Sequence, residues 1–408
     1  MAFCHYCLVA ATIQLTMTQS DMVNDNFLPF ALPCLGEEEI NEVEDTLRSG
    51  WLTTGPKTKR FEKDFAEFIG VPYALAVNSC TAALHLALEA IGIKSGDKVI
   101  TTPYTFTATA EVIRYLGADP LFIDIDPYTF NIDTQKLAAT LKTVDGIKAI
   151  LPVHFGGQAC DMDSILALAK THSLKIVEDA AHALPTYYKG HKIGLFGDIT
   201  AYSFYVTKTL ATGEGGMIVT ANPDYAKRIR TLRLHGISRD VFDRSASNQP
   251  KWFYEVVAPG FKYNMTDITA ALGIHQLKKA ETFQQRRAEI AAQYTQGLAD
   301  LPLRTPHVHP DSSHAWHLYV IQLQLEHLSI DRNTFIERMN DAGIGTSVHF
   351  IPLHLQQYWR DRYGFKPEDF PVALDVYQRA VSLPIYPCMS DENVARVIRT
   401  TRDILKKK

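Results

Sequence analysis

The sequence contains no apolar run approaching the roughly 20 residues that a membrane-spanning helix needs. It also lacks a strong excess of either charge, since 41 Lys and Arg stand against 45 Asp and Glu, a formal net charge of -4 at pH 7. We therefore expect neither a membrane nor a nucleic acid as the main partner.

Cysteine is scarce, and the six cysteines are scattered along the chain: Cys4, Cys7, Cys34, Cys80, Cys160 and Cys388. This pattern predicts the reduced thiols of a cytoplasmic protein rather than a disulfide framework. Cys4 and Cys7 form a C-x-x-C pair, but no second pair follows at zinc-finger spacing, so we expect no metal site.

The first sixteen residues are apolar but lack the basic region of a signal peptide. We expect residues 1–26 to be a poorly structured N-terminal extension, and Met17 and Met22 are alternative starts.

From about residue 37, helical and strand-like segments alternate. Short apolar runs of strand length lie at 73–79, 98–106, 120–126, 148–155, 175–181, 200–205 and 217–221. Amphipathic segments, such as 37–50 and 161–173, separate several of them. This alternation predicts an α/β fold with a mostly parallel sheet covered by helices on both faces. Ligands of such sheets bind at the carboxyl ends of the strands.

The pattern changes near Pro259. One long helix is predicted over 265–294, followed by a strand at 315–324, a helix at 332–343, a strand at 344–350 and a terminal helix near 391–407. We expect a large domain over 27–259 and a smaller α+β domain over 260–408.

The segment "NSCTAALHLAL" (78–88) predicts a strand, a tight polar turn and a helix. The amides of Thr81 and Ala82 would be free donors at the start of this helix, and they would suit a phosphate. The alternative is a simple N-cap by Ser79 or by Thr81 itself.

Asp179 lies at the carboxyl end of the apolar run 175–181. A carboxylate buried there needs a cationic partner, and a protonated pyridine nitrogen would serve. Its neighbour Glu178 should face the other side of the sheet. An N-cap of a following helix is the alternative for Asp179.

Lys208 lies between an aromatic strand and the glycine cluster "GEGG" (213–216). An amine in an apolar, water-poor position is less readily protonated, so it becomes nucleophilic and can form a Schiff base with an aldehyde. The glycines predict a tight turn in which the backbone approaches something bulky. An ordinary surface lysine is the alternative.

A phosphate cup, a strand-end aspartate and a nucleophilic lysine, in this order, predict a site for pyridoxal phosphate (PLP). The aspartate would keep the ring nitrogen protonated, so that the ring can accept electrons. Phe106, also at a strand end, is the candidate for stacking on the ring, with a core position as its alternative.

The chain resembles the DegT/StrS-type sugar aminotransferases, which have the PLP-dependent transferase fold type I. The resemblance runs from about residue 27 to the C-terminus. It is carried by motifs in the right order: "GWLTTGP", "NSCTAALHLAL", "DMD", "EDAAHA", "YYKGHKIGLFGD", "SFYVTKTLATGEGG", "LHGI", "KYNMTDI", "WHLYVI" and "SLPIYP". It looks especially similar to enzymes that aminate nucleotide-linked 4-keto sugars, including the one that makes UDP-4-amino-4-deoxy-L-arabinose.

The resemblance implies a catalytic Lys208 and a set of cofactor-binding residues: Thr81, Ala82, Phe106, Asp179, His182, Ser203, Lys208 and Asn264. Asn264 matches a residue that reaches the cofactor of the neighbouring subunit, which implies a homodimer with shared active sites. An N-cap of the long helix is the alternative for Asn264.

For the substrate, the resemblance implies contacts from Trp51, Thr53, Thr54, His314 and His349. A variable loop with Phe242, Asp243 and Arg244 would read the sugar. It also implies L-glutamate as amino donor and a nucleotide-linked keto sugar as acceptor. The carbon aminated, the nucleotide and the sugar stay open. A PLP-dependent sugar dehydratase or lyase is a rival, although such relatives replace the lysine with histidine, and a non-catalytic PLP-binding or sugar-nucleotide-binding regulator is another.

Overall fold

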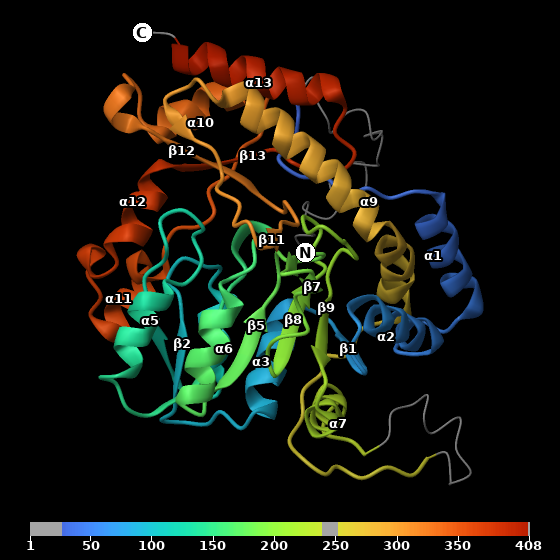
Figure 1. The fold of residues 1–408 in the computed structure, drawn as a ribbon. Coiled ribbons are helices and arrows are strands. Elements are labelled where there is room, and N and C mark those ends of the chain that lie inside the picture. Colours follow the sequence, from blue (N-terminus) through green and yellow to red (C-terminus); the bar gives the residue numbers. More distant parts are fainter. Residues whose placement is uncertain (1–26, 239–251, 407–408) are drawn as a thin grey trace, which may run out of the picture.

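A computed structural model describes residues 27–238 and 252–406 (Figure 1). The expected N-terminal extension with its C-x-x-C pair, and the loop residues Phe242, Asp243 and Arg244, lie outside the described residues. In the two described ranges, no helix combines the length and the apolar character that crossing a membrane would require.

A seven-stranded sheet forms the centre of the molecule. Its strands, in spatial order, are β1 (Tyr73–Val77), β9 (Gly216–Thr220), β8 (Ile199–Ser203), β5 (Lys175–Asp179), β4 (Ile147–Ile150), β2 (Lys98–Thr101) and β3 (Asp119–Phe122). Only β9 runs against its two neighbours, and the pairs from β8 to β3 are parallel. The predicted α/β fold with a mostly parallel sheet is therefore confirmed.

Helices cover both faces of this sheet because its strands are apolar on both sides. Along β1, Leu75 and Val77 face one core, which includes residues of α3 and α7, whereas Ala74 and Ala76 face another, which includes residues of α2, α6 and α9. The helices of the first part are α1 (Glu37–Ser49), α2 (Pro56–Ile69), α3 (Cys80–Ala90), α4 (Ala108–Tyr115), α5 (Thr134–Leu141), α6 (Met162–Thr171) and α7 (Pro223–Leu232).

The later part of the chain forms a smaller antiparallel sheet with its own helices. Its strands are β10 (Leu303–Arg304), β12 (Tyr319–Leu323) and β13 (Ala380–Leu383), and its helices are α9 (Asp267–Leu298), α10 (Arg332–Asp341), α11 (Gln357–Tyr363), α12 (Pro371–Arg379) and α13 (Asp391–Lys406). Short 3-10 turns are η2 (Phe155–Gly157), η3 (Leu325–His327), η4 (Leu353–Leu355) and η5 (Pro367–Asp369). A third small sheet joins β6 (Tyr187–Tyr188), β7 (His191–Lys192) and β11 (Ser312–Ser313).

Helix α9 belongs to both parts of the molecule. Ile274 and Leu277 pack in a core of the central sheet, whereas Ile290 and Tyr294 pack with β12, α10 and α13. In Figure 1 the helix runs from beside α1 and α2 to α13 at the top of the view. The predicted domain boundary near residue 260 thus falls just before a helix that the two cores share.

Two expectations about the fold and its cross-links are wrong. The predicted strand over 344–350 does not form, because Ile344 bridges to Leu28 while Ser347 bridges to Ser382 of β13, so no continuous ladder develops.

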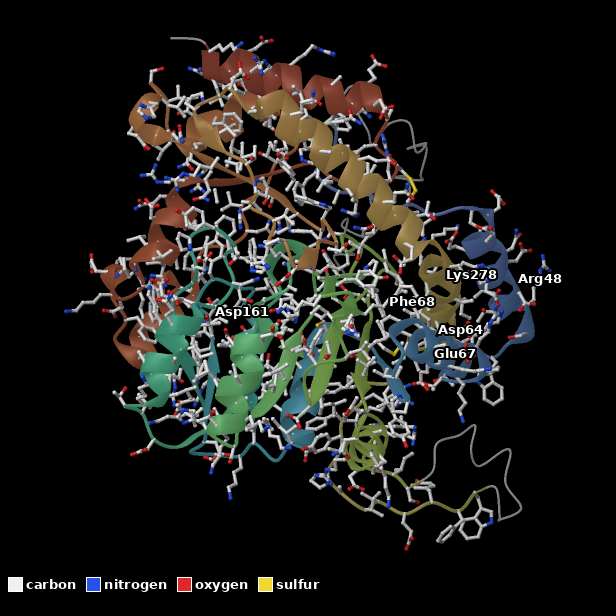
Figure 2. The ribbon with its side chains drawn as sticks, in the orientation of Figure 1. Arg48, Asp64, Glu67, Phe68, Asp161 and Lys278 are labelled. Atoms are coloured by element: carbon white, nitrogen blue, oxygen red, sulfur yellow. A yellow bond between two sulfur atoms is a disulfide. The ribbon has the colours of Figure 1, made fainter. Side chains whose placement is uncertain are left out.

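The second concerns cysteine: Cys34 and Cys388 are joined by a disulfide, drawn in yellow in Figure 2. Their Cα atoms lie 5.8 Å apart, a normal separation for this bond, although 354 residues separate them in the sequence. Cys80 and Cys160 are free.

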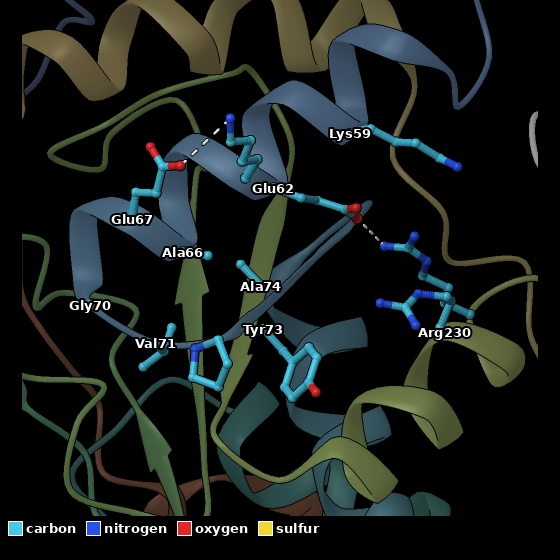
Figure 3. A pocket seen from close by; sticks show the side chains of 12 residues that line it. Lys59, Glu62, Ala66, Glu67, Gly70, Val71, Tyr73, Ala74 and Arg230 are labelled. Carbon is cyan, nitrogen blue, oxygen red and sulfur yellow. Dashed lines mark hydrogen bonds and ion pairs between the residues drawn. The ribbon is translucent and has the colours of Figure 1, made fainter.

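The outer edge of β1 is covered by an ion pair. Glu62 of α2 accepts a hydrogen bond from the Ala76 amide (2.9 Å), and Arg233, after α7, donates to the Ala76 carbonyl (2.8 Å). Glu62 and Arg233 also pair with each other. Beside them lies an open cavity of about 660 Å³, in which Figure 3 shows Glu62 pointing toward the end of α7 near Arg230. The pair therefore satisfies backbone groups that an edge strand would otherwise expose.

Candidate active site

A cavity of about 480 Å³ lies where several strands of the central sheet end. β1, β2, β4, β5 and β8 all deliver their carboxyl ends to this edge, as expected for a ligand site in such a sheet. The sequence-predicted residues that line it are Thr81, Phe106, Asp179, His182, Ser203, Lys208 and His349.

Lys208 lies in the turn after β8, where its amide donates to the Tyr205 carbonyl (2.8 Å). Its side chain is partly buried and points into the cavity, with Nζ 3.5 Å from Nε2 of His317. Burial lowers the pKa of Lys208 to about 8, against an opposing effect of Cys80 and Asp179. About a tenth of the amine is therefore unprotonated at pH 7, far more than for an ordinary lysine, and the surface-lysine alternative does not hold.

Asp179 ends β5 and is buried, with 5% of its surface exposed. Burial raises the pKa of its carboxyl group, and hydrogen bonds from Thr109 Oγ1 (2.8 Å) and the Ala181 amide (3.1 Å) act in the opposite direction. No helix follows directly, since β6 is the next element, so the N-cap alternative is wrong.

Glu178 faces the opposite side of the sheet from Asp179, as strand alternation predicts. Its carboxylate contacts Nε2 of His154 (2.9 Å) and accepts from Thr200 Oγ1 (2.8 Å). Nδ1 of His154 accepts from the Cys160 amide (3.1 Å), so the ring proton lies on Nε2 and is donated to Glu178. Only one of the two neighbouring carboxylates is therefore available to a ligand in the cavity.

The start of α3 forms one wall of the cavity. Ser79 is its N-cap and accepts from the Ala82 amide (3.1 Å), so the expectation of a free amide at Ala82 is wrong, while Thr81 lines the cavity. The bulky neighbour of the "GEGG" turn is this same helix start. A Cβ on Gly216 would lie 2.6 Å from the Ser79 carbonyl oxygen, which only glycine avoids.

Aromatic and imidazole rings form the opposite wall. The rings of His182 and His317 lie 4.4 Å apart, and Phe350 stacks on His182 at 5.9 Å. Burial, with the nearby Lys208, holds the pKa values of both histidines well below their usual range, so both rings are neutral. Phe106 is 60% exposed at the cavity and contacts Phe350, so it is not a core residue.

Among the cavity residues that the sequence did not predict, three matter for the chemistry: Thr109, His317 and Phe350. Thr109 follows three residues after Phe106, and Phe350 ends the predicted strand over 344–350, but nothing in the sequence singles either of them out. His317 follows Trp316 in "WHLYVI", and only its place next to Lys208 gives it chemical meaning.

Several predicted residues lie away from the cavity of this chain. His314 is buried, accepts from the Trp316 amide (2.8 Å) and stacks on the Trp316 ring at 4.2 Å. Asn264 donates to Thr54 Oγ1 (2.7 Å), and the Trp51 indole donates to the Thr54 carbonyl (3.2 Å).

Thr53 is exposed next to Thr54. Asn264 and the "GWLTTGP" loop therefore lie together, outside the cavity. Asn264 does not cap α9, because Thr266 does so by accepting from the Thr269 amide.

The residues of the cavity fit PLP. A lysine amine with a lowered pKa and a buried aspartate face the same space, beside a helix start packed against glycine. On a largely parallel sheet flanked by helices, this arrangement defines a PLP-dependent enzyme of fold type I.

The chain belongs to the DegT/DnrJ/EryC1/StrS aminotransferase family, whose model matches residues 33–402. It is 53% identical over 384 residues to the spore coat polysaccharide biosynthesis protein SpsC of Bacillus subtilis, covering 94% of this chain and 98% of SpsC. It is also similar to an uncharacterized protein of Methanocaldococcus jannaschii, MJ1066, at 51% identity over 94% of this chain and 99% of that protein.

Solved structures of similar proteins have the same fold. The putative sugar aminotransferase Spr1654 of Streptococcus pneumoniae, in its PMP form, has a TM-score of 0.86 at 34% identity, covering 93% of this chain and 99% of its own. PseC of Helicobacter pylori, an aminotransferase involved in the biosynthesis of pseudoaminic acid, has a TM-score of 0.86 at 30% identity, covering 94% and 100%. The present chain is thus a PLP-dependent aminotransferase of amino-sugar biosynthesis.

Proposed function

We propose that the protein transfers an amino group from L-glutamate to a nucleotide-linked keto sugar, at the 4-keto position, and releases a nucleotide-linked amino sugar. The observation that carries this proposal is that Lys208 and Asp179 face one cavity, the first with an amine of lowered pKa and the second with a buried carboxylate. The sugar acceptor is supported by relatives such as SpsC and PseC.

The proposal gives each cavity residue a role. Lys208 would hold the cofactor covalently through its aldehyde, and Asp179 would pair with the ring nitrogen. Thr81, Ala82 and Ser203 would bind the phosphate, for which the Ser79 hydroxyl would have to rotate and release the Ala82 amide. Phe106 and His182 contact the ring. His349 lines the cavity and is the predicted histidine best placed to meet the substrate.

When bound, the cofactor supplies an electron sink for the bonds at the reacting carbon. The chain supplies the proton transfers. The amine of Lys208, whose pKa is lowered, would take the proton from the α-carbon of the donor and pass it to the cofactor. Neutral His182 and His317 leave this amine without a competing positive charge.

We further propose a homodimer with shared active sites in the cytoplasm. Asn264, Trp51, Thr53 and Thr54 lie together and outside their own chain's cavity, which suits contacts with the cofactor and substrate of a partner subunit. A disulfide such as Cys34–Cys388 is uncommon in reducing compartments, so the location is the part of this proposal that most needs its own test. Cell fractionation and sedimentation would test the two parts separately.

Replacing Lys208 by Ala should abolish turnover and the visible absorption band of the lysine-bound cofactor, because no other amine of the cavity can form the bond. Lys63→Ala, at an exposed position of α2, is the matched control and should behave as wild type. A Lys208→Ala enzyme with near-normal transamination would refute the assignment.

The acceptor is identified by presenting a panel of nucleotide-linked keto sugars to the enzyme after it has taken the amino group from glutamate. We expect one 4-keto sugar nucleotide to restore the visible band and to leave as an amino sugar. Loss of sugar oxygen without amination would indicate a dehydratase or lyase, and the absence of any reaction with glutamate would indicate a regulator.

A further inference from the structure

The carboxylate of Asp179 receives its side-chain hydrogen bond from helix α4. Thr109 lies in the first turn of α4, is 1% exposed and donates from Oγ1 to Oδ2 of Asp179 at 2.8 Å. The Ala181 amide donates a hydrogen bond to Oδ1 of Asp179 at 3.1 Å. Each carboxylate oxygen thus has one donor, and only the donor of Oδ2 is a side chain that can be exchanged.

Thr109 is itself supported by a second buried hydroxyl. Thr105 Oγ1 lies 2.8 Å from Thr109 Oγ1, and Thr105 is 2% exposed. A hydroxyl has one proton, and Thr109 gives its proton to Asp179, so Thr105 must be the donor between the two threonines. The three groups form a directed chain, Thr105 to Thr109 to Asp179, in which each bond strengthens the next.

Few other groups around Asp179 favour its charged form. Lys208 and His154 act in that direction at a distance, and His154 does so from the other face of the sheet, where it pairs with Glu178. His182, His317 and His349 are neutral, and Cys80 at the start of α3 brings no positive charge. The buried carboxylate therefore relies on its hydrogen bonds.

We propose that Thr109, supported by Thr105, is a positioning residue that keeps Asp179 ionised and aimed at the ring nitrogen of the cofactor. The inference rests on the proposed pairing of Asp179 with that nitrogen. A hydrogen bond to a charged group contributes more than one between neutral groups, so its loss should weaken the pairing strongly.

The test compares two ligands on the cofactor-free full chain. One is PLP, and the other is its analogue with carbon in place of the ring nitrogen, which cannot pair with Asp179. Thr109→Val should weaken PLP binding about tenfold or more and change binding of the analogue about twofold at most. Thr109→Ser restores the hydroxyl and should bind PLP like wild type.

Thr105→Ala should give an intermediate loss for PLP, about threefold, because the donor to Asp179 remains but loses its support. This variant carries the test if Thr109→Val does not fold, as judged by circular dichroism. As the pH is lowered, Thr109→Val should also lose PLP affinity at a higher pH than the wild type does. The reason is that losing a donor raises the pKa of Asp179.

Equal losses for both ligands would show that Thr109 only shapes the site and would overturn the inference, as would unchanged PLP binding in Thr109→Val. Failure of the wild-type chain to bind PLP would instead overturn the proposed function, and this inference with it.

Discussion

At the scale of single residues, Lys208 illustrates how a reactive group is made at the expense of stability. Its pKa is lowered from 10.5 to about 8, chiefly by burial. The folded protein therefore gives up a proton that the unfolded chain keeps between these two pH values. The cost of burying this lysine lowers the stability of the folded protein by its full amount below about pH 8, and it disappears above about pH 10.5.

Replacing Lys208 by Met should therefore stabilise the cofactor-free protein at pH 7 by up to about 3 kcal/mol. The advantage over wild type should shrink as the pH rises to 10. Urea unfolding at pH 7 and at pH 10 measures the difference in unfolding free energy between the variant and the wild type. Lys63→Met is the control and should show no such pH dependence. A gain that is the same at both pH values would show that packing, and not the charge, is responsible.

The sequence was sufficient to find Lys208 and Asp179, because each stands where an apolar run ends and a charge there needs an explanation. It was insufficient for Thr109, His317 and Phe350, which look like ordinary members of their segments. Their significance arises from distances across the cavity, such as the 3.5 Å between Lys208 and His317, and a single sequence does not encode such distances in any local pattern.

At the scale of elements, periodicity located the sheet strands well, since strands buried on both faces give continuous apolar runs. It failed over 344–350, where an extended apolar segment is shared between Leu28 and β13. Hydrogen-bonding partners decide whether such a segment becomes a strand, and they lie far away in the chain.

The edge of β1 gives a prediction at this scale. Replacing Arg233 by Met should lower the free energy of unfolding by about 3 kcal/mol, because it leaves Glu62 and the Ala76 carbonyl without their partner in a largely buried place. Arg230→Met, at an exposed position of the same cavity, is the matched control and should change it by less than about 0.5 kcal/mol. Equal effects of the two variants would contradict the importance of the pair.

At the scale of the whole molecule, the disulfide joins the segment before α1 to the segment before α13. Scattered cysteines gave no hint of it, because the pairing depends on how the two ends of the chain come together. The Cys34 carbonyl also accepts from Gln276 of α9 (2.8 Å), so the bond lies beside the helix that the two cores share.

Removing the bond should lower the free energy of unfolding by about 2–4 kcal/mol, because the unfolded chain regains freedom. The free energy of unfolding should fall by the same amount in Cys34→Ser, Cys388→Ser and the double variant, because each breaks the same bond. A thiol reductant should lower it only in the wild type. The intact bond makes the wild-type chain lighter by two hydrogen atoms in mass spectrometry. Additive losses in the double variant would exclude a shared bond.

The cavity draws on widely separated parts of the chain: the start of α3 near residue 79 provides its first lining residues, and Phe350 provides the last. During synthesis the central sheet emerges from the ribosome long before His317, His349 and Phe350 do. A nascent chain can therefore display Lys208 and Asp179 without the wall that encloses them. Retention of the cofactor should then await the synthesis of this wall, and chains truncated before residue 317 should fail to retain it even where the sheet has folded.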